Sequence, residues 1–184
     1  MVFGRLFRRD AESDAIAAAV YGAIVAQARH PALYGDFGVA DTVDGRFEMV
    51  VLHTVLVLDR LQGSEANRAA AQRIFDLFCT DMDRSLRELG VGDLGVPKRM
   101  KEMTERFYGR AAAYRAALAA ADRLALADAL SRNVFGGPAT GAGPLAAYVL
   151  ASCEALATAP DGALFGQGPR FADPAGFATV GASA

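Results

Sequence analysis

The stretch from Asp81 to Arg110 constrains the fold most, because it predicts two helices joined by a tight connector. Apolar residues recur at spacings of three and four on both sides of the connector, which is the period of a buried helix face. Gly90 stands where a left-handed glycine closes a helix, and Pro97 fits the first turn of the next one. We therefore expect a helical hairpin whose two apolar faces pack together.

The basic residues of this hairpin lie at the end of a helix that favours negative charge. Lys98, Arg99 and Lys101 crowd the first turn of the second helix, where the helix dipole favours anions and each cation costs about 0.3–1 kcal/mol. Acidic residues lie at the end of the preceding helix, so opposite charges could meet across the connector. Two interpretations stay open: a solvated turn with compensating ion pairs, or a charged docking surface for another chain.

The composition favours helices throughout the chain. Its 184 residues suffice for one domain with a sizeable core. Alanine is abundant and strand-like alternation of Val, Ile and Thr is scarce, which suits the intrinsic helix preference of Ala. We predict an all-α, single-domain bundle of about six helices with a non-regular C-terminal tail. The net charge of −2 argues against nucleic acid as the main partner.

Caps, glycines and prolines set the expected boundaries. The expected helices cover residues 13–29, 45–61, 65–89, 97–119, 123–134 and 144–159. A break near Ala121, with Asp122 as the next N-cap, is expected because an uninterrupted helix over 97–134 would outrun a domain of this size. We divide the chain into a flexible basic and aromatic N-terminus (1–12), a helical domain (13–159) and a tail rich in Gly, Pro and Phe (160–184).

The two ends leave alternatives open. In the tail, Phe165, Phe171 and Phe177 recur every six residues, as in a strap over the core or a peptide that docks elsewhere. The N-terminus mixes aromatic and basic residues, which suits a short membrane-surface contact or a disordered end. Its candidate contact residues are Phe3, Arg5, Phe7, Arg8 and Arg9. The chain has no apparent secretory signal and no apolar run of the ~18–20 residues that a membrane-spanning helix needs.

We find no pattern that predicts catalysis, a metal or a cofactor. Cys79 and Cys153 lack zinc-ligand spacing and are expected to be buried, reduced thiols. His30 is expected to cap carbonyls at a helix end, and His53 to be a satisfied core or interface histidine. No nucleophile has a base beside it. The residues alone predict a non-enzymatic helical binding protein.

Several segments resemble the ubiquinol–cytochrome c chaperone family. They are YGAIVAQARHPALY at 21–34, DTVDGRFEMVVLH at 41–53, MDRSLRELGVGD at 82–93, FYGR at 107–110 and SRNVF at 131–135. Together they span about residues 15 to 150. The Ala-rich character and the lack of a long N-terminal extension resemble the bacterial members more than the mitochondrial ones.

The resemblance implies an all-helical, non-enzymatic assembly factor. Such a factor binds newly made cytochrome b, or another membrane-protein client, until the client enters the ubiquinol–cytochrome c reductase complex (complex III). A small accessory protein and the ribosome are the further partners that it implies. The location it implies is cytoplasmic, with peripheral contact to the inner membrane.

The charged hairpin carries the partner-binding prediction. Its candidate residues are Asp81, Asp83, Arg84, Arg87, Lys98, Arg99, Lys101, Tyr108 and Arg110. The alternative is a small-molecule module for haem or quinone, with His53, Cys79 or Tyr108 in an enclosed apolar pocket.

Overall fold

The computed structural model describes residues 2–62 and 65–177, except for the side chains of residues 2–9 and 66. The described residues form helices and no strands, which confirms the predicted all-α class. The elements are α1 (Val2–Ala28), α2 (Pro31–Gly35), α3 (Val43–Arg60), α4 (Glu65–Glu88), α5 (Val96–Ala119), α6 (Arg123–Val134), α7 (Ala142–Thr158), α8 (Asp161–Gln167) and the short 3-10 helix η1 (Pro174–Phe177).

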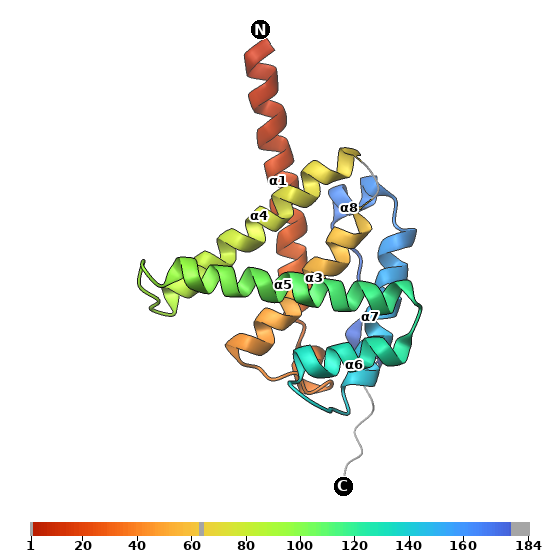
Figure 1. Cartoon of the computed structure of the whole chain (residues 1–184). Helices are drawn as coiled ribbons and strands as arrows, with labels where there is room; N and C mark the ends of the chain where they lie inside the picture. The colour runs from red at the N-terminus through yellow and green to blue at the C-terminus, as the bar shows by residue number, and fades with distance from the viewer. Residues whose placement is uncertain (1, 63–64, 178–184) are drawn as a thin grey trace.

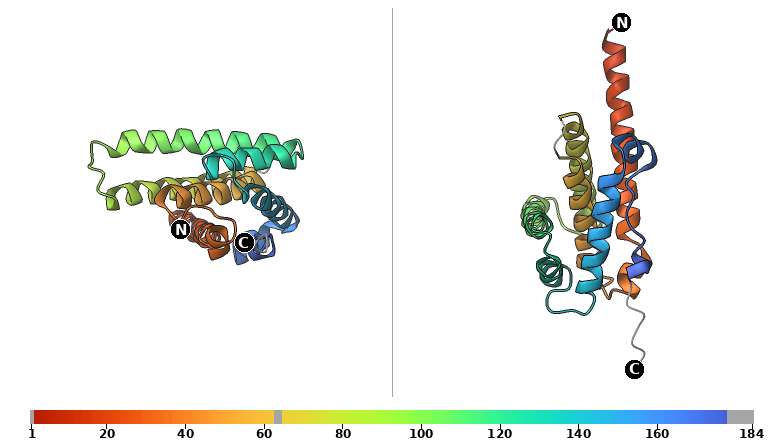
Figure 2. Two further views of the ribbon diagram at one scale, coloured as in Figure 1. Left: turned by 90° about the horizontal axis from the view of Figure 1, so that it is seen from below. Right: turned by 90° about the vertical axis from the view of Figure 1, so that its right-hand side faces the viewer.

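Helix α3 is the centre of the bundle. It contacts α1, α4, α5, α6 and α7, and every residue from Phe47 to Val57 is buried. Figure 2 shows α5 and α6 on one side of α3 and α1 on the other. The sequence makes α3 apolar on almost all sides, and such a helix is stable only when other elements cover it completely.

Helix α1 begins at Val2 and not at the expected Ser13. Residues 2–12 include no proline, so nothing in the backbone chemistry stops the helix from extending through them. The predicted boundary at residue 12 is therefore wrong as a helix boundary. The first turns of α1 project beyond the other helices in Figure 1.

Two short helices replace segments that we expected to be irregular. His30 is the N-cap of α2, where its Nδ1 accepts a hydrogen bond from the Ala32 N–H at 3.3 Å. The expectation that His30 caps the carbonyls of α1 is thus wrong. Helix α8 follows Pro160 at the start of the predicted tail. Helices of five and seven residues contain no more than about two turns, which is too short to show a helical period in the sequence.

The two predicted turns are confirmed. Gly90 has φ of 83°, and the Val91 N–H donates to the Leu86 carbonyl at 3.0 Å, as in a left-handed helix cap. Asp122 accepts hydrogen bonds from the Leu124 and Ala125 N–H groups, each at 2.9 Å. Ala121, directly before this cap, has φ of 52°. The chain therefore breaks between α5 and α6 at the expected position.

We predict that Ala121→Gly stabilises the protein by about 0.5 kcal/mol. A left-handed conformation costs a non-glycine residue about 1–2 kcal/mol, whereas the greater freedom of glycine in the unfolded chain costs about 0.4–1 kcal/mol. Urea unfolding of the variant and the wild type measures the difference. The matched control is Ala120→Gly, because Ala120 has φ of −79° and gains no relief. Equal or lower stability of Ala121→Gly would contradict the prediction.

The described part of the C-terminal segment is a strap over the core. Phe165, Phe171 and Phe177 all pack against it. The Ala172 N–H donates to Ser152 Oγ at 3.2 Å, and Gln27 Nε2 donates to the Ala172 carbonyl at 3.3 Å. The strap interpretation is confirmed for the segment up to Phe177, and residues 178–184 lie outside the described residues.

Within the described ranges, no single helix combines the length and apolar character of a membrane span. Helices α7 and α8 pass that test only as a pair, and they are bent by 107° at their junction.

Candidate functional site: the hairpin of α4 and α5

Helices α4 and α5 form the predicted hairpin, and aromatic rings hold them together. Phe107 packs on Phe75 and Phe78 with ring centroids 5.2 and 5.1 Å apart. Tyr108 is exposed, and its ring centroid lies 5.9 Å from that of Phe75. The two helices lie side by side, and the connector forms one far end of the molecule (Figures 1 and 2). The hairpin therefore presents a supported surface and not a loose loop.

The charges at the end of α4 pair mainly within that helix. Arg84 bonds Asp81 at 2.6 Å, and Arg87 bonds Asp83 at 2.7 Å. Arg87 also pairs with Asp93 in the connector. Asp81 has a further role, because its Oδ2 accepts a hydrogen bond from the Tyr21 hydroxyl of α1 at 2.9 Å. Burial and this carboxylate raise the pKa of Tyr21, so the hydroxyl stays a donor.

The cations at the start of α5 are exposed, and the ion pairs that the structure describes for them lie within α5. Arg99 contacts Glu102 at 3.2 Å, and Lys101 lies 3.9 Å from Glu105. Among the described residues Lys98 has no ion-pair partner. Of the two interpretations left open, compensating ion pairs across the connector are not found for these cations among the described residues. Arg99 and Lys101 instead pair with carboxylates three and four residues along their own helix, the spacing at which helical side chains are neighbours.

Arg110 lies away from the connector and anchors α5 to the bundle. Its guanidinium bonds both carboxylate oxygens of Glu48 at 2.7 and 2.8 Å, and it is 19% exposed. Arg106 bonds the same carboxylate at 2.7 Å and lies 4.9 Å from the ring centre of Phe47. The sequence analysis missed Glu48 and Arg106. The available signals were an acidic residue next to the long apolar run of α3 and two arginines four residues apart in α5.

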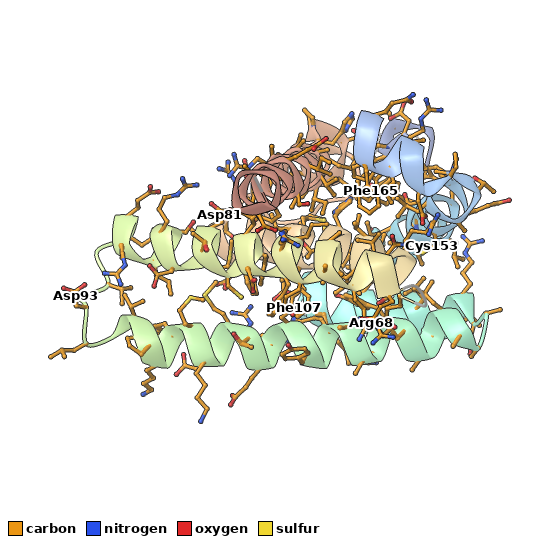
Figure 3. The ribbon with its side chains drawn as sticks, turned by 90° about the horizontal axis from the view of Figure 1, so that it is seen from above. Arg68, Asp81, Asp93, Phe107, Cys153 and Phe165 are labelled. Atoms are coloured by element: carbon orange, nitrogen blue, oxygen red, sulfur yellow. The ribbon has the colours of Figure 1, made fainter. Side chains whose placement is uncertain are left out.

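The tip of the hairpin (Arg87–Lys101) exposes apolar groups that the sequence analysis did not single out. Leu94 is 99% exposed, and Leu89 is exposed as well. Leu89 follows the last residue of α4, so the helical period no longer fixes its direction. Figure 3 shows Asp93, the neighbour of Leu94, at the far end of the hairpin from α1, α7 and α8.

The residues proposed for a small-molecule pocket do not come together. His53 is fully buried, and its ring contacts the Met49 carbonyl at 2.7 Å and the Tyr148 hydroxyl at 2.6 Å. The carbonyl can only accept, so Nδ1 donates to it and Nε2 accepts from Tyr148. Burial lowers the pKa of His53 to about 4. His53 is therefore a satisfied core histidine, as expected.

The described cavities lie elsewhere. One of about 340 Å³ is lined by Arg29, Pro31, Tyr34, Asp41 and Arg46, and one of about 320 Å³ by Asp14, Ala17, Arg73, Asp76, Leu77 and Thr80. Neither includes His53, Cys79 or Tyr108. No group of potential ligands within the described residues could hold a metal ion.

The cysteines are half-buried and free, which is less burial than we expected. Burial raises the pKa of Cys153 to about 11 and also raises that of Cys79. Both thiols stay protonated at neutral pH and are poor nucleophiles or ligands.

An all-helical protein with a projecting charged hairpin (Figure 1) fits the class of protein-binding factors. The family model described as ubiquinol-cytochrome C chaperone matches residues 35–171. The crystal structure of the Cbp3 homolog from Brucella abortus is similar, with a TM-score of 0.87 and 44% sequence identity over 95% of this chain and 98% of that chain. No curated protein matches the sequence. The chain belongs to the ubiquinol–cytochrome c chaperone family, as its sequence motifs predicted.

Proposed function

We propose that this protein is a non-enzymatic chaperone that binds a hydrophobic membrane-protein subunit during assembly of complex III, with cytochrome b as the client. Family membership supports the chaperone role and its connection with the ubiquinol–cytochrome c reductase complex. The observation that carries the proposal is the projecting hairpin, which exposes cations and apolar side chains that the fold does not use.

The exposed ion pairs of the hairpin suit a surface whose charged side chains exchange their own partners for those of a client. Exposed ion pairs contribute about 0–1 kcal/mol each, so exchanging one partner for another costs little. Asp83, Arg84, Arg87, Lys98, Arg99, Lys101 and Tyr108 form this proposed client surface. Asp81 and Arg110 have a different part in the proposal, because Tyr21 and Glu48 hold them against the bundle. They position the hairpin, and the remaining residues contact the client.

The first experiment is a crosslinking pull-down of the tagged protein from detergent-solubilised membranes of its own cells. Recovery of cytochrome b, or of other subunits of the ubiquinol-oxidising complex, is the expected result. Recovery of a haem or quinone with no membrane protein would favour the small-molecule alternative instead. The same pull-down tests the accessory protein and the ribosome, which stay predictions.

We predict that the triple variant Lys98→Gln, Arg99→Gln and Lys101→Gln captures at least about tenfold less client, since charge complementarity contributes to both steering and binding. Its melting temperature should be unchanged or slightly raised, because cations at a helix start are unfavourable. The matched control carries Gln at Arg123, Arg132 and Arg170, which are exposed in α6 and in the strap. Wild-type capture by the hairpin variant, or an equal loss in the control, would contradict the client surface.

The proposed location is the cytoplasmic side of the inner membrane. The N-terminal contact residues Phe3, Arg5, Phe7, Arg8 and Arg9 fall in the first turns of α1, but their side chains lie outside the described residues. Their contact with a membrane therefore stays a prediction.

A further inference from the structure

One of the two cavities described above is lined by residues around the end of α1, in α2 and around the start of α3. Its volume is about 340 Å³, and its lining residues are Arg29, Pro31, Tyr34, Asp41 and Arg46. Small-molecule sites in proteins have volumes of about 300–1,000 Å³. None of these lining residues belongs to the proposed client surface, so client binding leaves the cavity unexplained.

Arg29 contributes a positive charge that no described residue neutralises. It directly follows α1 and is exposed, and its guanidinium has no ion-pair or hydrogen-bond partner within the described ranges. An unpaired guanidinium on the wall of a cavity keeps all of its N–H donors for a ligand or for water.

Arg46 contributes a second guanidinium, from α3. Its Nε donates to Asp41 Oδ1 at 2.6 Å, and this bond orients the group. Its two Nη atoms make no hydrogen bond to any described residue. The wall thus carries two cations and one carboxylate, a net charge of +1. The neighbouring carboxylates do not cancel this charge, because Asp36 does not line the cavity and Asp44 pairs with Arg106.

Tyr34 lies within electrostatic reach of both guanidinium groups. Burial raises the pKa of Tyr34, and the positive charges of Arg46 and Arg29 both act against that rise. The Tyr34 hydroxyl donates to the Ala28 carbonyl at 2.7 Å, which holds the phenol ring against the end of α1. The cavity therefore brings two cations from different elements to one fixed aromatic ring.

A phosphate ester fits this arrangement better than a carboxylate does. A carboxylate is planar, and a single guanidinium already matches both of its oxygens. The phosphate group of an ester carries nearly two negative charges and three acceptor oxygens, so it can accept hydrogen bonds from two guanidinium groups at once. Pro31 and the ring of Tyr34 offer an apolar wall to the organic part of the ester.

We propose that this cavity binds the phosphate group of a small soluble phosphate ester, with Arg29 and Arg46 as the residues that hold it. Asp41 positions Arg46 and does not itself contact the phosphate. The inference goes beyond the proposed function, because it requires no client and uses no residue of the client surface.

The test follows the arginine side chains by nuclear magnetic resonance in the full-length, ¹⁵N-labelled protein. Phenyl phosphate is the probe, because it joins a phosphate to a ring. The Nε–H signals of Arg29 and Arg46 should move as the probe is added at constant ionic strength. The signal of Arg132, which is exposed on α6 and outside the cavity, should not move. Benzoate, which has the same ring and a carboxylate, should bind at least about tenfold more weakly.

Two variants measure the contribution of each cation. Arg29→Gln, followed at the Arg46 signal, should weaken phenyl phosphate binding about tenfold, the scale of one charge-assisted hydrogen bond. Its melting temperature should equal that of the wild type, because Arg29 has no partner to lose among the described residues. Arg46→Gln should weaken binding at least as much, since it also leaves the charge of Asp41 uncompensated. Arg132→Gln is the matched control and should bind as the wild type does.

Four results would overturn the proposal: no movement of the Arg29 and Arg46 signals, equal movement of the Arg132 signal, benzoate binding as tight as that of phenyl phosphate, or wild-type affinity in both cavity variants. Sedimentation of the wild type, but not of Arg29→Gln, with phosphatidylglycerol vesicles would also overturn it and would assign the cavity to a lipid head group. Because these assays contain no client, their failure leaves the chaperone proposal standing, and failure of client capture leaves the phosphate site standing.

Discussion

Glu48→Gln is expected to lower the free energy of unfolding by about 3–5 kcal/mol, the usual cost of breaking a buried ion pair from one side. The Glu48 side chain is 3% exposed and bonds both Arg106 and Arg110. Removal of its charge leaves the two guanidinium groups together, and within the described part of the chain Asp44, 3.3 Å from Arg106, is their remaining acidic partner. Urea unfolding followed by circular dichroism gives the free energy directly.

The control for Glu48 is Glu105→Gln, which removes the same charge from an exposed carboxylate 3.9 Å from Lys101. That change should cost less than about 1 kcal/mol. A second variant separates the charge from the packing: Glu48→Met combined with Arg106→Met and Arg110→Met should recover most of the lost stability, since an apolar replacement leaves no buried charge. A loss below about 1 kcal/mol in Glu48→Gln would show that the network does not anchor α5.

The Glu48 network also links the core to the proposed client surface. Both arginines belong to α5, and Glu48 belongs to the central helix α3. At the other side of the hairpin, the Tyr21 hydroxyl holds Asp81 of α4 to α1. Arg73 of α4 also bonds Asp14 of α1 at 2.9 Å, and Arg115 of α5 bonds Asp59 of α3 at 2.6 Å. Both helices of the hairpin are thus fixed to the bundle, and the far end of the hairpin is left to project.

Features that depend on a few neighbouring residues were predictable from the sequence. Gly90 and Asp122 ended and began helices as expected, because a left-handed glycine and an N-cap act within one turn. The central position of α3 followed from its nearly uniform apolar character. The start of α1 was not predictable in this way, because Ser13 is a good N-cap that the helix simply passes.

Contacts between distant parts of the chain could not be predicted by such reasoning. In the sequence Arg110 is not distinguishable from the other cations of the hairpin. In the structure, however, it pairs with a carboxylate 62 residues away. His53 was expected to be satisfied, but its partner Tyr148 lies 95 residues further along the chain. Periodicity gives the face on which a residue lies, whereas its partner depends on how the helices pack.

His53 should make the protein less stable as the pH falls from about 6.5 to about 4. Its pKa is lowered from 6.5 to about 4 in the folded protein because burial disfavours the charged ring. In this window the unfolded chain binds a proton at His53 and the folded chain does not, so protonation favours unfolding. This difference between the two pKa values corresponds to about 3 kcal/mol of unfolding free energy. The contribution is fully present above the pKa of the unfolded chain and is lost on acidification.

The His53→Gln variant isolates this contribution, because glutamine is polar but does not titrate. Loss of the contacts with Met49 and Tyr148 should destabilise the variant at neutral pH by about 1–3 kcal/mol. Between pH 7 and pH 4, however, its free energy of unfolding should fall by about 3 kcal/mol less than that of the wild type, since carboxylates titrate equally in both proteins. Urea unfolding at a series of pH values gives the two curves. Parallel curves would mean that His53 accepts a proton as readily in the folded protein as in the unfolded chain. Phe171, which packs on His53, and Phe177, which packs on Tyr148, would then not exclude water from the histidine.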